Sequence, residues 1–206
     1  KDILLNYRDI SHLKFVEKYM ANSLGTNSTF LNFGAGHGGL SYLMAAKNIK
    51  VINIEPSKIY SSDLINFNSF KNLDEFNQSD LKNEKVDLLY SSHTLEHLTD
   101  PNYFFNSISK LLKPNGKVFI EVPNCRRLPI PKNYAEGGCD GKTTGSHLIY
   151  FTKDFFEKIG SEIFFISEQN NQTKYKEVTS EDEADCIRAI IKSEDISKYL
   201  KNYKNY

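Results

Sequence analysis

The apolar positions of this chain follow two different spacings along its length. Several short apolar runs have the length and composition of buried strands, and they lie at residues 29–33, 50–55, 85–92, 116–122, 162–167 and, more weakly, 184–192. Between these runs, apolar side chains recur every three or four residues, which is typical of amphipathic helices. Strands that alternate with helices predict an α/β fold, in which a mostly parallel sheet is covered by helices on both faces.

A leading helix is predicted within residues 1–25. Ile10, Val16 and Met20 lie at helical spacing there, and Gly25 follows at a position typical of a helix C-cap. The last residues, "SEDISKYLKNYKNY", predict a further helix that frays at its end.

Capping signals mark two more helices. Asp100 is a candidate N-cap, Pro101 suits the first turn, and Pro114 ends the apolar spacing that follows. Thr152 is the candidate cap of a helix that ends at Gly160.

Two segments lack a regular spacing. Residues 123–147 are rich in proline and glycine, so residues 123–150 are predicted to form a long loop or lid on the acceptor side. Residues 169–183 are polar and predict a surface connection. No internal repeat is visible, and residues 1–206 are therefore interpreted as a single domain.

Charge and cysteine content narrow the classes of function. The 206 residues include 26 Lys and Arg and 26 Asp and Glu, so the chain has no excess positive charge with which to bind nucleic acid or an anionic membrane. No apolar run approaches the roughly 18 residues of a membrane span. The three cysteines are widely spaced, which favours a reduced, cytoplasmic protein, and the oligomeric state is left open.

The stretch "LNFGAGHGGL" joins a predicted strand to a predicted helix. Gly34, Gly36 and Gly39 satisfy the pattern G-x-G-x-x-G, and Glu55 ends the next strand, 21 residues after Gly34. Glycines let a backbone approach a ligand closely, and an acid at this spacing accepts hydrogen bonds from ribose hydroxyls. The pattern alone fits a dinucleotide, S-adenosylmethionine (SAM), or a tight turn without a ligand.

Three later stretches distinguish between these ligands. "VDLLYSSHTLEHLTDP", "LLKPNGKVFIEVPN" and "HLIYFTKDFFEKIG" follow the glycine loop in an order that resembles the class I SAM-dependent methyltransferases, over about residues 25–192. The resemblance is to the broad group that includes sugar and small-molecule O-methyltransferases. It implies one Rossmann-like methyltransferase domain with a seven-stranded sheet, whose last strand is antiparallel.

The resemblance also implies a SAM site. Asn32 stands where the family often has an acid, and its missing charge should weaken the attraction for the positive groups of the cofactor. In this family the adenine lies after strand three, where Asn72 would reach it and Leu73 would pack on the ring. The residues expected to bind the cofactor are Asn32, Gly34, Ala35, Gly36, Gly38, Glu55, Pro56, Asn72, Leu73 and Ser91.

The stretch "HTLEH" and a later histidine carry candidate catalytic chemistry. If a helix follows strand four, His93, Glu96 and His97 share one face, and His147 would approach from the long loop. Metal-dependent members of the family, among them small-RNA 3′-end and ubiquinone-pathway methyltransferases, show a related E-x-x-E-H pattern. This pattern covers Glu96 and His97, and it covers His93 by position only.

Three hypotheses for these residues stay open, with His93, His147 and His97 as the candidate catalytic groups. In the first, these histidines and Glu96 bind a divalent metal, for which three imidazoles suit Mn, Fe, Co or Zn better than Mg. In the second, one histidine, His147 or His93, acts as a metal-free general base. In the third, Glu96 and His97 only cap and brace the helix.

The long loop supplies the candidate acceptor-binding residues. Arg126 and Arg127 would clamp a phosphate or carboxylate, and Tyr134 would line a sugar or ring. Solvated loop charges are the alternative interpretation of the two arginines.

These observations predict a SAM-dependent O-methyltransferase. Its acceptor is expected to be a small polar molecule, such as a sugar or a phosphorylated or phosphoramidate-type precursor of surface (capsule) polysaccharide. The alternatives are a metal-dependent RNA 3′-end or quinone-pathway methyltransferase and, in another class, an NAD-type dinucleotide-dependent oxidoreductase. The balanced charge speaks against RNA, because phosphate binding usually leaves a basic footprint.

Overall fold

A single mixed sheet forms the centre of the computed structural model, which describes residues 5–125 and 147–203. The sheet has eight strands in the order β3-β2-β1-β4-β5-β8-β6-β7. These strands are β1 (Thr29–Phe33), β2 (Lys50–Ile54), β3 (Asn68–Phe70), β4 (Val86–Ser92), β5 (Leu112–Pro123), β6 (Glu162–Gln169), β7 (Lys174–Val178) and β8 (Cys186–Lys192).

Strands β1 to β6 run in one direction, and β7 and β8 run antiparallel to them. The mostly parallel sheet and its antiparallel last strand are thereby confirmed, but there are eight strands instead of the expected seven. The additional strand β7 lies within residues 169–183, where a surface connection was expected. Asn170, Asn171 and Gln172 have positive φ and turn the chain back onto β6. The sequence pattern did not indicate β7 as a strand, because β7 is polar and lies at the edge of the sheet.

The helices agree with the capping signals. They are α1 (Tyr7–Met20), α2 (Gly39–Ala45), α3 (Lys58–Ser61), α4 (Leu73–Gln78), α5 (Pro101–Ser109), α6 (Lys153–Ile159) and α7 (Ser193–Tyr203). The Asp100 side chain accepts hydrogen bonds from two backbone N–H groups of α5, and Gly160 ends α6 in the left-handed conformation. Thr152 occupies the N-cap position of α6, although its side chain makes no capping hydrogen bond. In the described ranges, no helix combines the length and apolarity needed to cross a membrane.

The leading helix differs from its prediction in length and in the face that it buries. Helix α1 ends at Met20, and a short 3-10 turn over Ala21–Ser23 follows it. His12 and Phe15 are buried with Met20, whereas Ile10 is 39% exposed. The buried polar His12 shifts the packed face around the helix.

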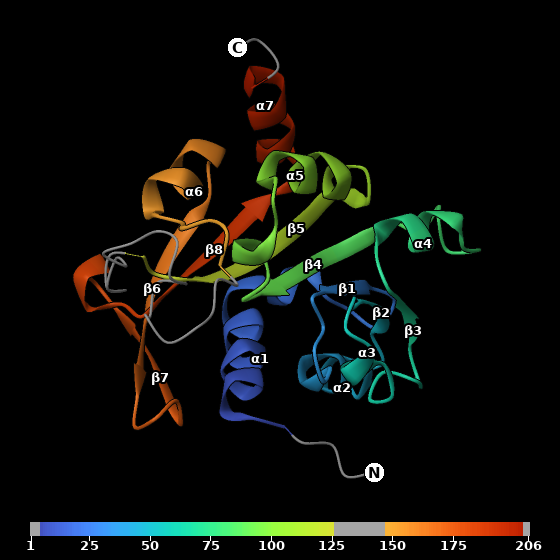
Figure 1. Cartoon of the computed structure of the whole chain (residues 1–206), viewed down its shortest axis with the longest axis horizontal. Coiled ribbons are helices and arrows are strands. Elements are labelled where there is room, and N and C mark those ends of the chain that lie inside the picture. Colours follow the sequence, from blue (N-terminus) through green and yellow to red (C-terminus); the bar gives the residue numbers. More distant parts are fainter. Residues whose placement is uncertain (1–4, 126–146, 204–206) are drawn as a thin grey trace.

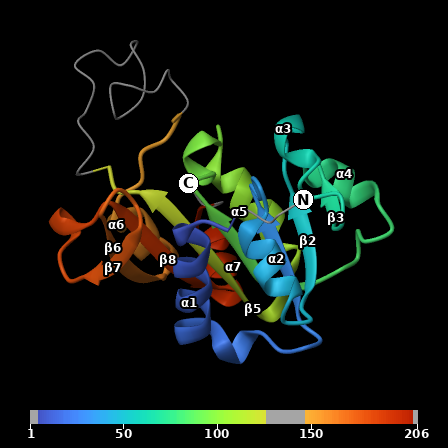
Figure 2. The ribbon, with the colours of Figure 1, turned by 90° about the horizontal axis from the view of Figure 1, so that it is seen from below.

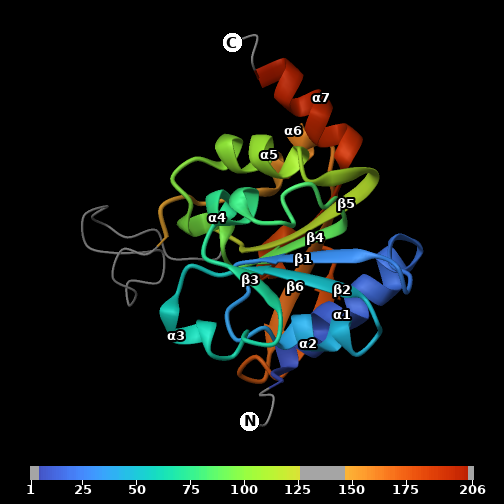
Figure 3. The same cartoon turned by 90° about the vertical axis from the view of Figure 1, so that its right-hand side faces the viewer.

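The helices cover both faces of the sheet, as predicted. Helices α1 and α2 lie on one face and α5, α6 and α7 on the other (Figure 1, Figure 3), and α1 and α2 stand in front of the sheet when it is viewed from below (Figure 2). Alternate strand residues supply two separate cores. Leu88 and Phe119 belong to the core that contains Phe15 of α1, and Leu89 and Ile120 belong to the core on the other face.

The topology places a ligand site at the carboxyl ends of β1 and β4. Strand β1 lies between β2 and β4, so the strand order reverses at this point of the sheet. Ligands of open α/β sheets bind in the crevice outside the carboxyl ends of the strands at such a reversal.

A buried carboxylate lies between α1 and the sheet. Glu121 of β5 is 0% exposed, and its Oε2 accepts a hydrogen bond from Arg188 Nε at 2.6 Å. Its Oε1 accepts a hydrogen bond from Ser92 Oγ at 3.1 Å and lies 2.9 Å from His12 Nε2 and 3.3 Å from His93 Nε2. These partners offset the loss of hydration that a buried charge suffers.

Burial and the neighbouring side chains together set the ionisation of Glu121 and His12. Burial acts to raise the pKa of the Glu121 carboxyl, but the hydrogen bond from His12 and the positive charge of Arg188 outweigh it and hold that pKa well below its ordinary value. Burial lowers the pKa of His12 in spite of the nearby carboxylate, so His12 is neutral. The Tyr90 hydroxyl lies 2.6 Å from His12 Nδ1 and is assigned as its donor, which leaves the imidazole proton on Nε2, facing Glu121.

Removing the partner of the buried carboxylate should destabilise the fold. We expect Arg188→Met to lower the free energy of unfolding by about 3 to 5 kcal/mol, because Glu121 then keeps an uncompensated buried charge. Chemical denaturation measures the difference. The control Lys192→Met, at the exposed end of the same strand, should change stability by about 0.5 kcal/mol or less. Equal effects of the two substitutions would contradict this account of Glu121.

The neutral state of His12 predicts a dependence of stability on pH. Because burial lowers the pKa of His12 in the folded protein, the unfolded chain binds more protons below the ordinary histidine value of about 6.5. The contribution is fully present above that value and is lost as the pH falls below it. Between about pH 7.5 and about pH 5.5, wild type should lose up to about 1 kcal/mol more stability than His12→Gln. Parallel pH profiles from denaturant titrations would show that His12 does not titrate on unfolding.

Candidate functional site

A cavity of about 1000 Å³ opens at the carboxyl ends of the parallel strands. Its volume suits a cofactor together with part of a second molecule. The glycine loop, the end of β2, the N-terminus of α4 and the turn after β4 line the cavity. The predicted cofactor residues that line it are Asn32, Gly34, Ala35, Gly36, Gly38, Glu55, Pro56, Asn72 and Leu73.

The glycine loop has a conformation that side chains would disturb. Gly34, Gly36 and Gly38 all have positive φ, where residues with a Cβ are strained. The N–H groups of Gly34 and Ala35 both donate to the Ile54 carbonyl at the end of β2. A Cβ at Gly34 would overlap the Thr94 side chain, whereas the space around Gly36 is open. The loop is therefore tied to its neighbours and leaves room on the cavity side.

Glu55 braces the loop from the end of β2. Its Oε2 accepts a hydrogen bond from the Gly36 N–H at 2.7 Å, and its Oε1 accepts one from the Ser57 N–H at 2.8 Å. A carboxylate has about four acceptor sites, so these two bonds leave capacity for two hydroxyl donors. The geometry thus holds the carboxylate in place and lets it accept hydrogen bonds from a ligand.

Of these two predicted cofactor residues, Asn32 lines the cavity and Ser91 does not. Asn32 is 2% exposed, and its amide donates to Ser41 Oγ at 2.9 Å while its Oδ1 lacks a hydrogen-bond partner in the described part of the chain. Ser91 is buried and is not among the residues that line the cavity, so the structure does not place it in the predicted cofactor site. Ser92 lines the cavity instead. Side chains alternate along a strand, and a shift of one residue moves a side chain to the other face of the sheet.

Asn72 and Leu73 lie at the start of α4, on the side of the cavity beyond β2. The Asn72 Oδ1 accepts a hydrogen bond from the Glu75 N–H at 2.9 Å and so caps the helix. One acceptor site of the oxygen and both amide hydrogens stay available for a ligand. Leu73 supplies an apolar wall next to them.

Glu96, His97 and His147 form a compact group beside the cavity. One potential ligand atom from each lies within 4.8 Å of the others, and the two imidazole rings are 4.9 Å apart. The Glu96 carbonyl accepts hydrogen bonds from the N–H groups of Leu148 and Ile149, which brings His147 to this position. Glu96 is 2% exposed, and its carboxylate oxygens have no hydrogen-bond partner within the described ranges, although Oε1 forms an ion pair with His93 Nδ1 at 3.4 Å. A buried carboxylate of this kind suits a cation.

His93 is placed differently from its prediction. It has φ of 49° and precedes a short 3-10 turn over Leu95–His97, so it does not share a helical face with Glu96 and His97. Its Nδ1 lies 3.4 Å from Glu96 Oε1, whereas its Nε2 points to Glu121 and Cys186. The grouping of potential ligands therefore joins His93 with Glu168 and Cys186 instead of His97 and His147.

The charge of His93 argues against its role as a general base. Burial acts to lower its pKa, but Glu121 and Glu96 outweigh burial and raise the pKa of His93 to about 9. At neutral pH the imidazole is thus protonated and has no lone pair with which to accept a proton. His97 and His147 remain the candidates for that role.

The predicted acceptor-binding residues of the long loop lie outside the described residues. These are Arg126, Arg127 and Tyr134, and the expectation of a loop or lid can be compared with the structure only at its two ends.

Sequence reasoning missed the contribution of α1. Asn6, Arg8 and Asp9 line the cavity, and Asp9 packs so closely on Gly39 that a Cβ at Gly39 would overlap its carboxylate. Asn6 and Asp9 form a capping box, with the Asn6 Oδ1 accepting from the Asp9 N–H at 2.8 Å. The spacing of Asn6 and Asp9 in "NYRD" carries that signal and could have located the start of the helix.

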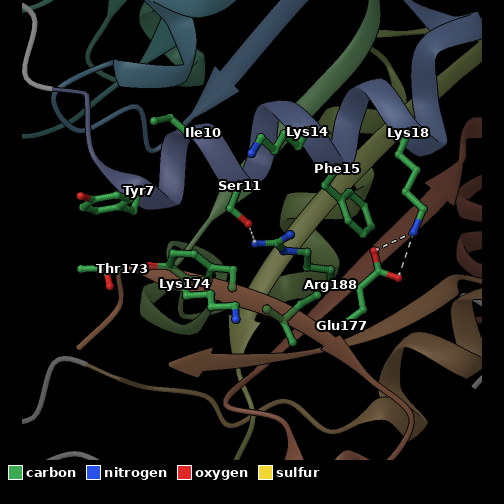
Figure 4. Close-up of a pocket in the computed structure, with 12 residues that line it drawn as sticks. Tyr7, Ile10, Ser11, Lys14, Phe15, Lys18, Thr173, Lys174, Glu177 and Arg188 are labelled. Carbon is green, nitrogen blue, oxygen red and sulfur yellow. Dashed lines mark hydrogen bonds and ion pairs between the residues drawn. The ribbon is translucent and has the colours of Figure 1, made fainter. Parts of the chain in front are cut away.

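A second, smaller cavity of about 290 Å³ lies on the other side of α1, against β6, β7 and β8 (Figure 4). Lys14 and Lys18 of α1 and Lys174 of β7 stand around it, and Lys18 pairs with Glu177. Arg188 also lines it, and its guanidinium donates to Ser11 Oγ at 3.0 Å. Arg188 thus connects this cavity to Glu121.

Comparison with known sequences gives one family. A model described as a methyltransferase domain matches residues 8–162. A ubiquinone biosynthesis O-methyltransferase of Pelagibacter ubique is 31% identical over 104 residues, which cover 48% of this chain and 43% of that protein. One of Histophilus somni is 29% identical over 126 residues, which cover 55% of this chain and 52% of that protein. The chain thus matches about half of the length of these curated relatives.

Solved structures share the fold at low sequence identity. A SAM-dependent methyltransferase from Archaeoglobus fulgidus has a TM-score of 0.60 and 20% identity, over 88% of this chain and 93% of that one. An N-methyltransferase from Bradyrhizobium japonicum, bound to S-adenosylhomocysteine, has a TM-score of 0.60 and 14% identity, over 92% of this chain and 88% of that one. At these identities the similarity establishes the fold.

Proposed function

The chain belongs to the methyltransferase domain family, and from this premise we propose that it transfers a methyl group from SAM to a hydroxyl oxygen of a small acceptor. One observation carries the proposal. His97 belongs to the group formed by Glu96, His97 and His147, and it also lines the cavity that the glycine loop and Glu55 line. A site for a nucleoside-type donor and a site for proton removal therefore share one cavity.

The chain's own residues suit each part of SAM. The Glu55 carboxylate can accept hydrogen bonds from both ribose hydroxyls, because the loop N–H groups use only part of its capacity. Asn72 and Leu73 offer polar and apolar contacts to the adenine. The Asn32 Oδ1 is a buried acceptor without a partner in the described chain, and it suits the ammonium group of the amino-acid tail.

Methyl transfer also requires the acceptor hydroxyl to lose its proton. The oxygen attacks the methyl carbon in line with the departing sulfur, and His97 or His147 takes the proton if its imidazole is neutral. Glu96, His97 and His147 also fit a divalent metal, since one potential ligand atom from each lies within 4.8 Å of the others. When bound, such a metal would lower the pKa of the acceptor hydroxyl. The mixed N and O donors favour Zn, Fe, Co or Mn over Mg.

The acceptor is inferred from the relatives. The two relatives described above are named as ubiquinone biosynthesis O-methyltransferases, which favours O-methylation and an acceptor of the quinone pathway. The sugar or phosphorylated polysaccharide precursor and the cytoplasmic setting stay predictions from the sequence. The balanced charge continues to speak against RNA. We therefore propose an aromatic hydroxyl compound as the first acceptor to test. Its methylation would be compared with that of nucleotide sugars, with labelled SAM as the methyl donor in both assays.

Replacing Glu55 should weaken SAM binding. We expect Glu55→Ala to raise the dissociation constant about 100-fold, because two charge-assisted hydrogen bonds are lost at about 1.5 kcal/mol each. Isothermal titration calorimetry gives the constant, and Glu55→Gln should lie between wild type and Glu55→Ala because it keeps one acceptor oxygen. Glu17→Ala, an exposed acid on α1 that pairs with Lys47, serves as control. Unchanged SAM affinity in Glu55→Ala would remove Glu55 from the cofactor site.

Disrupting the group of Glu96, His97 and His147 should abolish turnover and spare the cofactor. We expect Glu96→Gln and His147→Ala to lower kcat at least about 100-fold while the dissociation constant of SAM changes less than about threefold. A chelator then distinguishes the two mechanisms. Loss of activity that Mn or Zn restores supports the metal, whereas chelator-insensitive activity that falls with an apparent pKa of about 6 to 7 supports a histidine base. Full activity in both variants would exclude either role.

A further inference from the structure

A second group of metal-binding side chains lies behind the turn after β4. His93 follows β4, Glu168 lies in β6 and Cys186 begins β8, and one ligand atom from each lies within 4.8 Å of the others. The Cys186 sulfur lies 3.4 Å from Glu168 Oε1 and 3.8 Å from His93 Nε2. The group shares no residue with Glu96, His97 and His147.

We propose that His93, Glu168 and Cys186 form a second divalent-metal site, suited to zinc or a chemically similar ion. A tetrahedral ion with bonds of about 2.0 to 2.3 Å holds its ligand atoms about 3.3 to 3.8 Å apart. Both measured distances from the sulfur fall in this range. Two of the three distances between ligand atoms thus already suit a bound ion. The third, between His93 and Glu168, would need only an adjustment of their side chains.

The backbone holds all three side chains in place. Cys186 is opposite Ile166 in the pairing of β6 with β8, so Glu168, two residues after Ile166, faces the same side of the sheet as Cys186. The left-handed His93 donates its N–H to the Glu121 carbonyl at 2.9 Å, which fixes the backbone from which its imidazole projects. Little ordering remains for an ion to impose, which favours binding.

Solvent reaches the group to a limited extent. Cys186 is 3% exposed, and the side chains of His93 and Glu168 are 24% and 13% exposed. An ion can therefore enter from the cavity side past His93, which lines the large cavity. Three protein ligands leave the fourth position of a tetrahedral ion to water that enters from the same side.

Metal binding by this group would be coupled to proton release. A divalent ion binds cysteine as the thiolate and histidine as the neutral imidazole, so any proton on either group leaves when the ion binds. The guanidinium of Arg8 borders the group, with its Nη2 3.3 Å from Glu168 Oε1.

The chemistry of the three ligand atoms determines which ions the site would bind. Thiolate, imidazole and one carboxylate suit Zn, Co or Fe, whereas Mg and Ca prefer oxygen ligands alone. A bound ion would join the turn after β4 to strands β6 and β8. The first group, with two imidazoles and a carboxylate, contains no sulfur, and this difference makes the two sites distinguishable by spectroscopy.

The test is a titration of the metal-free full chain with Co²⁺, followed by absorption spectroscopy. We expect a near-ultraviolet band from charge transfer between thiolate and cobalt, which Cys186→Ser abolishes. The other two cysteines of the chain give matched controls, because Cys125→Ser and Cys139→Ser should keep the band. His147→Ala, which removes a ligand of the first group alone, should also keep it. Because Cys186 is buried, Glu168→Gln provides a second variant. It should retain the band and weaken Co²⁺ binding at least about tenfold.

Two results would overturn the site. The first is the absence of a cysteine-dependent band at saturating Co²⁺. The second is a band that survives Cys186→Ser and disappears with Cys125→Ser or Cys139→Ser. Since the measurement is absorbance and not methyl transfer, either result would leave the proposed methyltransferase activity unaffected.

Discussion

The buried carboxylate of Glu121 is the constraint on which the arrangement of this domain depends. A carboxylate at 0% exposure is tolerated only where cationic and hydrogen-bonding partners surround it. Arg188 reaches it from β8, and His12 reaches it from α1. Strand β8 must therefore pair with β5 in a register that sets Arg188 opposite Glu121, and α1 must dock with His12 facing the sheet. That docking also brings Asp9 against the glycine loop.

Local signals in the sequence were enough to predict most of the elements. The Asp100 cap and the left-handed Gly160 mark the ends of two helices correctly, because caps and C-terminal glycines act within a few residues. The glycine loop and Glu55 also lie together as their spacing predicts. The edge strand β7 was not predicted, because both of its faces are largely polar.

The features that could not be predicted from the sequence depend on contacts between residues far apart in the chain. Strand β4 is buried along most of its length, so its pattern does not show which of Ser91 and Ser92 faces the cavity. The positive φ of His93 goes with a hydrogen bond to β5, which no local pattern encodes. Charged residues inside apolar strands, as in "FIEV" and "CIRAII", were the available signal for the Glu121 and Arg188 pair. Such residues are seldom buried unless they are paired.

The two halves of the candidate site are mechanically connected through one short segment. Thr94 packs against Gly34 of the glycine loop, and it directly precedes the 3-10 turn that carries Glu96 and His97. Because a Cβ at Gly34 would overlap Thr94, the loop and the turn have no free space between them, and a displacement of one must displace the other. A donor that fills the glycine loop would thus set the position of the residues proposed to deprotonate the acceptor. The close contact between a glycine and a threonine gives a physical reason for the two proposed sites to share one cavity.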